Sequence, residues 1–331
     1  IAYLMEKPRP GDAPPVKLKN NRFSRLFEPI TRIFSLPDYF ELDPTLFFAP
    51  FFTLFFGLCL GDVGYGLILT AISLACLAFI PPAYRLIAWL GLVLSLSTTI
   101  AGVLLNSVFG AALLEGSPVA SLAVFAPREA AGKTIYPAMS LSLALGFVQL
   151  TTGIVLSAAN AWQRHGWLYS LKSLGSLFML LGGLTLATHA DPMSLGLNSA
   201  LQIGPFPAGK LITSVPEAGG LILLAAGGFL FFFFNSPDLS LYLRPLSGLW
   251  AFYQFATGLL GDFLSYIRLF ALGLASGLLG NAFNQIAFMI LPGGTSGPEF
   301  LSPWIVLTVL ILILGHTLNL GLAVLGAFVH P

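Results

Sequence analysis

Charged residues are scarce in this chain of 331 residues. Only 9% of them are Asp, Glu, Lys or Arg, whereas 56% are hydrophobic and the mean hydropathy is +0.87. A soluble domain carries about a quarter charged residues. The composition therefore excludes a soluble globular protein and predicts a membrane protein with several spanning helices. The net charge of +1 by itself indicates no class of partner, and no nucleic-acid partner is expected.

Cysteines and ligand-binding motifs are also few. Cys59 and Cys76 both lie in apolar runs, which is typical of buried free thiols rather than of a disulfide. The sequence has no Gly-x-x-x-x-Gly-Lys-Ser/Thr phosphate loop and no Cys/His cluster with metal-ligand spacing, so neither a cofactor nor a metal is expected. No motif supports a nucleophile–base pair among the four histidines. We therefore expect no catalytic site on this chain.

The first 45 residues differ from the rest because they hold seven of the fifteen basic residues. Between positions 23 and 34, apolar side chains recur at helical spacing with basic residues on the other faces. This pattern predicts a short helix, kinked at Pro29, that lies flat at the cytoplasmic membrane surface or packs against a preceding domain. Since the sequence starts at Ile1 without a signal peptide, we expect residues 1–45 to end a missing N-terminal cytoplasmic domain.

After Asp43 and Pro44 the sequence is a succession of apolar runs, which form the predicted membrane domain, residues 46–331. At about 20 residues per crossing, we predict an all-α membrane protein with eight transmembrane helices. They cover residues 46–61, 63–80, 84–110, 137–159, 167–189, 216–235, 251–290 and 303–330. A single kinked crossing over 46–80 is the alternative, which would give seven crossings.

Eight crossings place both chain ends on one side of the membrane. The lead-in and the loops on that side carry eleven basic residues, against three on the other side. The positive-inside rule therefore puts both termini in the cytoplasm, whereas seven crossings would put the C-terminus outside. We expect the outer loops 111–136 and 190–215 to be irregular. No internal repeat is visible, which disfavours a transporter built from inverted repeats.

One arginine stands inside the longest apolar run. A guanidinium such as that of Arg268 costs about 2.5–3.5 kcal/mol in the middle of a membrane on insertion scales, and it stays charged at physiological pH. Such a charge indicates an anionic partner or an ion path. Asp262, six residues earlier, is either a counter-ion or channel group, or a carboxylate that reaches the interface.

Polar and small residues form a stripe on this predicted seventh helix. Gln254, Gly261 and Arg268 recur every seven residues, and Ser265 lies close to the same stripe. Small residues are frequent over 271–280. They would let another helix approach the guanidinium closely, although ordinary helix packing uses the same composition.

The predicted eighth helix carries its own polar stripe. His316, Ala323 and His330 are spaced by seven residues, and Asn319 lies between them on the same face. An imidazole titrates near neutral pH and can relay protons. A membrane histidine that is simply hydrogen-bonded in the packing is the alternative.

Four segments containing these residues resemble the membrane domain of the stator subunit of V/A-type rotary ATPases, called subunit I in prokaryotes and subunit a in eukaryotes. They are residues 50–66, 261–275, 315–319 and 324–330. The most specific is the Ser265-Tyr-Ile-Arg268-Leu stretch. The likeness runs from about Lys17 to the end of the chain.

The resemblance implies a stator membrane subunit of a rotary ATPase or ATP synthase, without a catalytic site of its own. Its last two helices would be long and tilted against a rotating proteolipid ring. Arg268 would meet the ion-carrying carboxylate of the ring, beside two half-channels for protons or sodium ions. The half-channel candidates are Gln254, Asp262, Ser265, His316, Asn319 and His330.

The resemblance also implies the partners and the location. We expect the proteolipid ring, the lipid bilayer and, through the missing N-terminal domain, peripheral-stalk and central-stalk-associated subunits. The protein would be a multi-pass protein of a prokaryotic plasma membrane. Two departures are visible: Gln254 and Ala323 stand where eukaryotic relatives carry glutamates, and the second arginine that usually follows the final histidine would lie beyond Pro331.

Two other functions fit the residues alone. The first is a secondary transporter or channel in which Arg268 binds an anionic substrate. The second is a membrane scaffold in which Arg268 only pairs with Asp262.

Overall fold

The structure is a computed structural model that describes residues 16–34, 36–112, 116–130, 133–190, 202–203, 206–207, 212, 214–291 and 303–329. These residues are mostly α-helical. Among them, six helices are long and apolar enough to cross a membrane by length and composition: α4 (Arg85–Leu105), α5 (Pro137–His165), α6 (Trp167–Ala190), α9 (Glu217–Phe234), α10 (Arg244–Met289) and α11 (Trp304–Val329). Two shorter apolar helices precede them, α2 (Thr45–Leu60) and α3 (Val63–Phe79).

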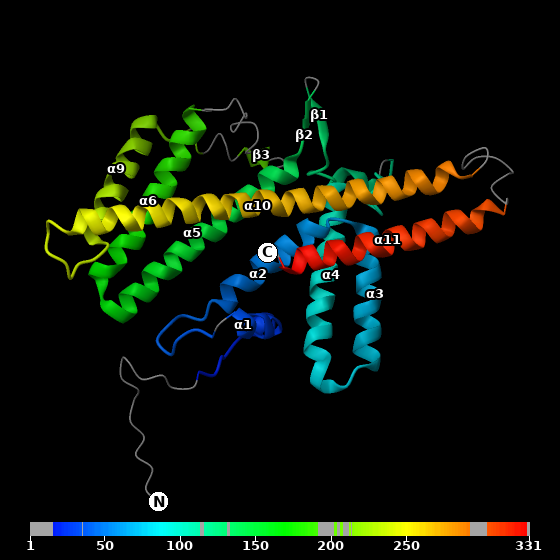
Figure 1. The fold of residues 1–331 in the computed structure, drawn as a ribbon, viewed down its shortest axis with the longest axis horizontal. Helices are drawn as coiled ribbons and strands as arrows, with labels where there is room; N and C mark the ends of the chain where they lie inside the picture. Colours follow the sequence, from blue (N-terminus) through cyan, green and yellow to red (C-terminus); the bar gives the residue numbers. More distant parts are fainter. Residues whose placement is uncertain are drawn as a thin grey trace, which may run out of the picture.

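Each of the eight predicted runs coincides with one of these helices, while the number that cross a membrane stays a prediction. The chain breaks between α2 and α3, so residues 46–80 form two helices, and the alternative of a single kinked crossing over this stretch also stays a prediction. Gly61 closes α2 with a positive φ of 46°, which favours glycine. The side chain of Asp62 then caps α3 by accepting a hydrogen bond from the Tyr65 backbone N–H at 3.1 Å. Figure 1 shows that α2 and α3 run in different directions.

Three predicted boundaries need correction. The fourth run was expected to end at residue 159, but α5 continues to His165. The third run was expected to continue to residue 110, but α4 ends at Leu105 because Asn106 adopts the left-handed conformation (φ 57°) that ends helices. The seventh begins at Arg244 rather than 251, with Pro245 in the first turn, where its missing N–H is not needed. The resulting helix α10 has 46 residues, which corresponds to about 69 Å.

Some short elements connect the helices. The predicted irregular loop 111–136 contains a 3-10 turn and a small antiparallel hairpin. The short elements are η1 (Ser24–Phe27), α1 (Glu28–Phe34), η2 (Pro82–Tyr84), η3 (Pro118–Leu122), β1 (Arg128–Ala130), β2 (Lys133–Ile135), β3 (Gln202–Ile203) and β4 (Phe206–Pro207).

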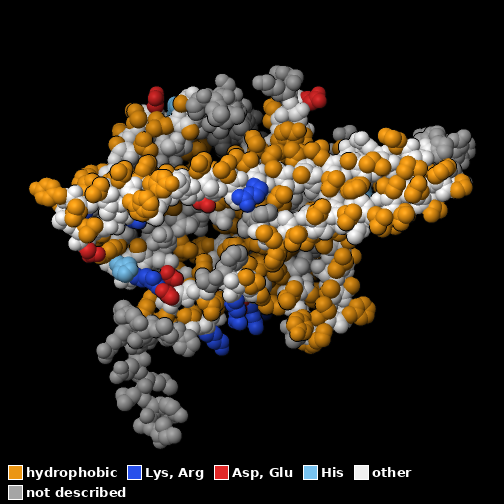
Figure 2. Space-filling model, viewed as in Figure 1, with side chains coloured by type: hydrophobic (Ala, Val, Ile, Leu, Met, Phe, Trp, Pro, Cys, Tyr) orange, Lys and Arg blue, Asp and Glu red, His pale blue; other side chains and the backbone are white. Residues whose placement is uncertain are grey.

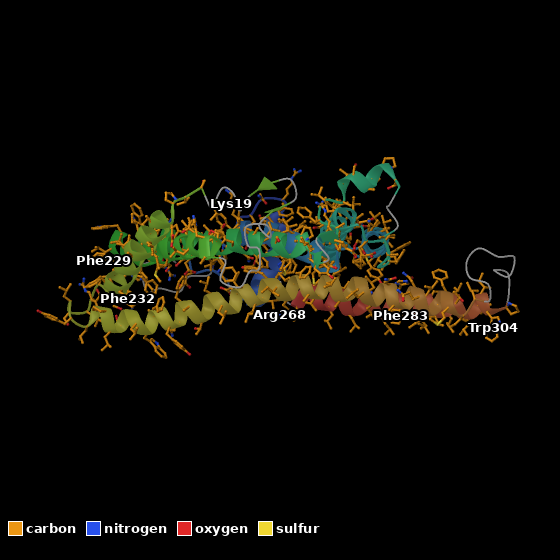
Figure 3. All side chains as sticks on the ribbon, turned by 90° about the horizontal axis from the view of Figure 1, so that it is seen from above. Lys19, Phe229, Phe232, Arg268, Phe283 and Trp304 are labelled. Carbon is orange, nitrogen blue, oxygen red and sulfur yellow. The ribbon has the colours of Figure 1, made fainter. Side chains whose placement is uncertain are left out.

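Helix α10 organises the arrangement of the others. Figure 1 shows it running across the whole molecule, with α5, α6 and α9 grouped at its N-terminal half and α11 beside its C-terminal half. The α3–α4 pair crosses this axis steeply. Viewed at right angles, α10 and α11 lie along one edge and the remaining helices lie on the other side (Figure 3). One long side of α10 and α11 is therefore left uncovered by the other described helices.

The largest core cluster surrounds α2. Phe52, Phe55 and Phe56 of this helix are buried together with Tyr266 of α10 and Ala327 of α11. Since α2 contacts both long helices, it holds α10 and α11 in place relative to each other. Cys59 is buried in the same cluster, and Cys59 and Cys76 are both free thiols, as predicted.

The predicted short helix of the lead-in is present as η1 followed by α1, with the change from 3-10 to α geometry next to Pro29. Its apolar side packs against α2: the rings of Phe27 and Phe52 are 6.0 Å apart, and Ile30 is buried in the same core. The surface that the sequence assigned to a membrane interface or to a preceding domain is thus partly occupied by α2.

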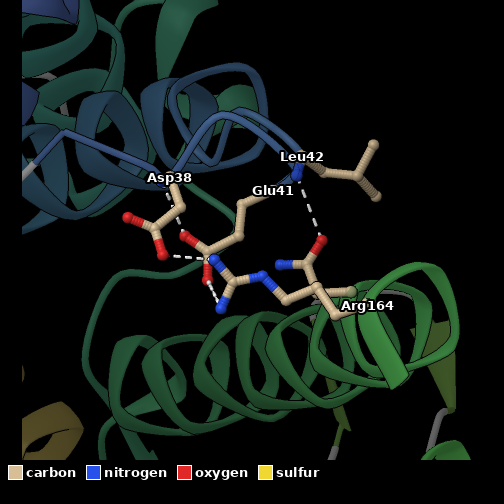
Figure 4. Close-up of polar contacts among 5 residues, drawn as sticks. Asp38, Glu41, Leu42 and Arg164 are labelled. Atoms are coloured by element: carbon tan, nitrogen blue, oxygen red, sulfur yellow. Dashed lines mark hydrogen bonds and ion pairs between the residues drawn. The ribbon is translucent and has the colours of Figure 1, made fainter. Parts of the chain in front are cut away.

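A cluster of polar contacts fastens the following loop to the end of α5 (Figure 4). Arg164 forms ion pairs with Asp38 and, at 3.3 Å, with Glu41. The Leu42 backbone N–H donates to the Asn160 side chain at 3.1 Å. These contacts connect the lead-in to the α5–α6 hairpin.

Candidate functional site

Arg268 lies about midway along α10 and is exposed in the isolated chain. Figure 3 labels it on the edge formed by α10 and α11. Its neighbours Leu264 and Ile267 are exposed apolar residues, so the guanidinium stands on a side of the helix that is otherwise suited to lipid or to another protein. In a membrane, such a charge requires a compensating partner.

Asp262 does not stand directly above Arg268. Six residues correspond to about 240° around an α-helix, whereas side chains that meet along a helix are three or four residues apart. Asp262 also lines a cavity that Arg268 does not line. The geometry thus gives the two residues different surroundings.

A first cavity, which we call the N-side cavity, adjoins the N-terminal half of α10. Its volume is about 620 Å³, and α10 lines it from Ala251 to Tyr266, including Gln254 and Asp262. Polar groups of α5 and α6 complete the wall: Gln149, Ser157, Lys172, Ser173 and Ser176.

Two contacts order the wall of the N-side cavity. The Tyr266 hydroxyl donates to Gln149 Oε1 at 3.3 Å, and the Lys172 ammonium lies 5.8 Å from the centre of the Phe231 ring, within cation–π range. Lys172 is therefore a charged member of this cavity.

A second cavity, the C-side cavity, adjoins the C-terminal half of α10. It measures about 230 Å³, and α10 lines it from Phe270 to Asn281. The other walls come from the end of α2, the end of α4, the loop after α4 and the start of α5. Asn106 is among them, and its buried side-chain oxygen lacks a hydrogen-bond partner in the described structure. A buried acceptor of this kind is suited to bind water.

Helices α3, α10 and α11 are joined by a closed hydrogen-bond network. The Tyr65 hydroxyl lies 2.8 Å from His316 Nδ1, and His316 Nε2 lies 3.0 Å from Asn284 Oδ1. Asn319 donates to the Tyr65 hydroxyl and to the Ser276 carbonyl, both at 2.8 Å. Every polar side chain in this set thus has a partner, as buried polar groups need.

The donor directions in this network form a consistent order. Asn284 donates its amide to the Phe109 carbonyl at 2.8 Å, so its oxygen is left to accept from His316 Nε2. The other ring nitrogen of His316 then accepts from Tyr65, whose oxygen accepts from Asn319. This order needs a neutral imidazole with the proton on Nε2.

Asp62 anchors the neighbouring loop. It is 2% exposed, and its carboxylate accepts four hydrogen bonds: from the backbone N–H groups of Tyr65, Phe109 and Gly110, and from the Ser107 hydroxyl, at 2.8–3.1 Å. Phe109 has a positive φ of 52°, an uncommon conformation for a bulky residue. The carboxylate therefore fixes a strained loop whose Gly110 packs on the backbone of α10.

The small residues of α10 are used in two ways. A Cβ at Gly273 would lie 2.8 Å from the Leu58 carbonyl, and one at Gly280 would lie 3.1 Å from the Phe109 carbonyl. These positions serve close packing within the chain, which was the alternative interpretation of the sequence. A Cβ at Gly261 or Gly277 would meet open space.

Five of the six predicted half-channel candidates lie among the described residues, in three places. Gln254 and Asp262 both line the N-side cavity, and His316 and Asn319 both belong to the network. Ser265 is half-exposed and lines neither cavity. His330 lies outside the described residues.

Sequence reasoning missed Asn281 and Asn284 on α10. The signal was present, because two asparagines one turn apart interrupt an otherwise apolar stretch. Within the described parts of the chain, no group of three or more His, Cys, Asp or Glu side chains could hold a metal ion.

Comparison with known proteins finds relatives among the subunits of rotary ATPases. Residues 2–81 match the model of the V-type ATPase 116 kDa subunit family. The A-type ATP synthase subunit I of Pyrococcus abyssi is 31% identical, over 96% of this chain and 43% of its own length. The corresponding subunit of Methanocaldococcus jannaschii is 29% identical, over 99% of this chain and 47% of its own. V-type ATP synthase subunit I 1 of Treponema pallidum is 28% identical, over 99% and 50%.

These findings define an integral membrane protein built of apolar helices, related to rotary ATPase subunits. The family expected from the sequence is confirmed: the chain is a homologue of subunit I of V-type and A-type ATP synthases over nearly its whole length. The chain spans about half the length of the relatives it matches.

Proposed function

We propose that this chain is the membrane part of a rotary ATPase stator, in which Arg268 confronts the ion-carrying carboxylate of a proteolipid ring. In this proposal α2, α3, α4, α5, α6, α9, α10 and α11 are the eight crossings and both termini are cytoplasmic. The uncovered side of α10 and α11, tilted in the membrane, faces the ring. Stalk subunits bind the part of the protein that precedes this chain.

The observation that carries the proposal is the position of Arg268 between the two cavities. The N-side cavity borders α10 from residue 251 to 266, and the C-side cavity from 270 to 281. Gln254 and Asn281 are about 40 Å apart along the helix, more than the roughly 30 Å of membrane hydrocarbon. Two offset aqueous half-channels, one to each side of the membrane, fit this arrangement.

The electrostatics then define a cycle. A ring carboxylate crosses lipid in its neutral form, because an unpaired ion there costs several kcal/mol. Beside the stator it releases its ion into one half-channel, and Arg268 compensates the exposed negative charge. After rotation, the carboxylate reloads from the other half-channel before it returns to lipid. Each proton that crosses is worth about 2.3 kcal/mol per 100 mV.

Gln254 and Asp262 are the groups of the N-side half-channel in this proposal. On the opposite path His316 is the candidate proton relay and Asn319 its neighbour in the network, although neither lines the C-side cavity directly. His330 continues the same stripe. Whether protons or sodium ions pass depends on the carboxylate site of the ring.

The test uses the complete rotary complex in proteoliposomes, with Arg268→Lys and Arg268→Ala. The lysine variant keeps the charge but loses the planar fork, so ATP-driven acidification should fall at least about tenfold while the complex still assembles. Arg244→Lys, on the same helix, is the matched control and should pump normally.

Two results would contradict the proposal. Normal acidification with Arg268→Ala would remove the arginine from the ion path. Substrate transport by the purified chain alone in liposomes would favour the secondary transporter instead, since a stator without its ring should be inert.

A further inference from the structure

A cluster of exposed cations covers one end of the molecule. We call it the basic hook, and it consists of Lys17, Lys19, Arg22, Arg25 and Arg32 on the segment 16–34, all exposed. In Figure 2, basic side chains gather at the lower surface of the molecule, near the position of α1 in Figure 1.

The acidic residues around the basic hook make their contacts with residues other than its cations. Asn20 donates to Glu28 at 3.2 Å and to Asp43 at 2.9 Å. Asp38 and Glu41 pair with Arg164. Within the described residues, neither of these ion pairs includes a cation of the hook, so its positive charge is directed outward.

The hook is also held rigidly. Phe27 and Ile30, on the inner side of the same segment, are buried against α2. Because the inner side is fixed in the core, the outer side presents its cations as a preformed surface rather than as a flexible basic tail.

Exposed apolar residues flank these cations. Phe23 and Ile33 lie on the hook itself, and Ile33 is 75% exposed. At the same end of the molecule, the tip of the α3–α4 pair carries Phe79, which is 88% exposed, and Tyr84. Cations beside exposed aromatic and aliphatic side chains are typical of a protein surface at the headgroup layer of a membrane.

We propose that the basic hook binds the headgroups of anionic phospholipids in the adjacent leaflet. A phosphodiester matches the guanidinium groups of Arg22, Arg25 and Arg32, which can each donate two hydrogen bonds. The apolar neighbours reach the acyl boundary, and this combination favours lipid over a protein partner or a free phosphate ion. The bound lipids would fasten the lead-in to the membrane surface where it enters α2.

The test uses the full-length protein in nanodiscs that contain phosphatidylglycerol and phosphatidylcholine. The measured quantity is the enrichment of spin-labelled phosphatidylglycerol over spin-labelled phosphatidylcholine at the protein boundary. Each basic residue near an anionic surface corresponds to about a fivefold preference. In the triple variant Arg22→Gln, Arg25→Gln and Arg32→Gln, the preference of the hook for phosphatidylglycerol over phosphatidylcholine should therefore fall roughly a hundredfold.

The matched control replaces the same three arginines by lysine. It keeps the charge and should keep most of the preference for phosphatidylglycerol, and in both variants the α2 core is untouched. Raising the salt concentration should weaken enrichment in the wild type and in the lysine variant.

Three outcomes would overturn the proposal. The first is equal enrichment of the two lipids around the wild-type protein at low salt. The second is an unchanged preference in the glutamine variant. The third is efficient cross-linking of Arg25→Cys to the preceding part of the full-length protein, because a protein segment would then cover the hook. None of these results bears on Arg268 or on ion transport.

Discussion

Two aspartates, Asp62 and Asp262, have opposite surroundings in the same helical assembly. Asp62 is almost fully buried and accepts four hydrogen bonds. Asp262 is exposed and lines a cavity of about 620 Å³. All of the hydrogen bonds to the Asp62 carboxylate come from its own chain, so this residue stabilises the packing of the loop after α4. The Asp262 carboxylate faces a cavity that can hold water or an ion.

The same contrast extends to the nearest tyrosines. Tyr65 lies in a closed network with His316 and Asn319 at 2.8 Å. Tyr266 makes only a longer contact of 3.3 Å with Gln149, beside the N-side cavity. Thus the polar groups near the C-terminal half of α10 mainly hold helices together, while those near its N-terminal half mainly line space.

The largest effect is expected when the two aspartates are changed in parallel. Asp62→Asn places an amide N–H₂ among four donors, and hydrogen bonds to a charged group are each worth about 1.5–3 kcal/mol. We expect the free energy of unfolding, measured by denaturant titration in detergent micelles, to fall by about 3 kcal/mol. Asp262→Asn, the same chemical change at an exposed site, should alter it by less than about 0.5 kcal/mol.

Equal losses of stability in the two variants would contradict the assignment of Asp62 to packing and of Asp262 to the cavity. Asp62→Ala separates two causes of destabilisation. Asparagine places its amide N–H₂ against the N–H and O–H donors, whereas alanine only removes the carboxylate that accepts from them. If the loop 107–110 depends on the carboxylate, alanine should destabilise the protein at least as much as asparagine does.

A smaller effect is expected from the tyrosines. Tyr65→Phe removes one hydroxyl that serves both His316 and Asn319, and it leaves Asn319 with an unpaired buried donor. This should lower the unfolding free energy by about 1–2 kcal/mol. Tyr266→Phe removes one long hydrogen bond and should leave the unfolding free energy almost unchanged. A larger loss of stability for Tyr266→Phe than for Tyr65→Phe would contradict the assignment of Tyr65 to helix packing and of Tyr266 to the cavity wall.

The helices themselves could be predicted from the sequence because membrane helices are long apolar runs with clear ends. The Gly61-Asp62 pair marks the break between α2 and α3 in the sequence, since glycine and a capping carboxylate end one helix and begin the next. The end of α4 was missed because Val108 and Phe109 continue the apolar run beyond Asn106. Hydrophobicity alone does not mark a left-handed residue inside such a run.

The site was predictable only in part. Arg268 and Asp262 stood out because a charge in an apolar run is energetically unusual. Gln254 stood out because it lies two seven-residue repeats before Arg268. The role of Asp62 could not be found, because three of its four partners lie in a loop more than forty residues away. Tyr65, His316 and Asn284 likewise meet only through the packing of three helices, which no local pattern specifies.

The subtlest test leaves stability unchanged and asks from which side each cavity opens. In a background with Cys59→Ala and Cys76→Ala, single thiols are introduced by Gln254→Cys in the N-side cavity and Asn281→Cys in the C-side cavity. A membrane-impermeant thiol reagent is then added to one side of oriented vesicles, and labelling is measured by mass spectrometry.

Because Arg268 lies between the two cavities, the two thiols should react from opposite sides: Gln254→Cys from the cytoplasmic side and Asn281→Cys from the outer side. Leu264→Cys, on the exposed apolar side of α10, is the matched control and should react slowly from either side in the assembled complex. If both cavity thiols reacted from the same side, the cavities would form one vestibule. Arg268 would then not separate two paths, and the contrast between the two halves of α10 would reflect packing alone.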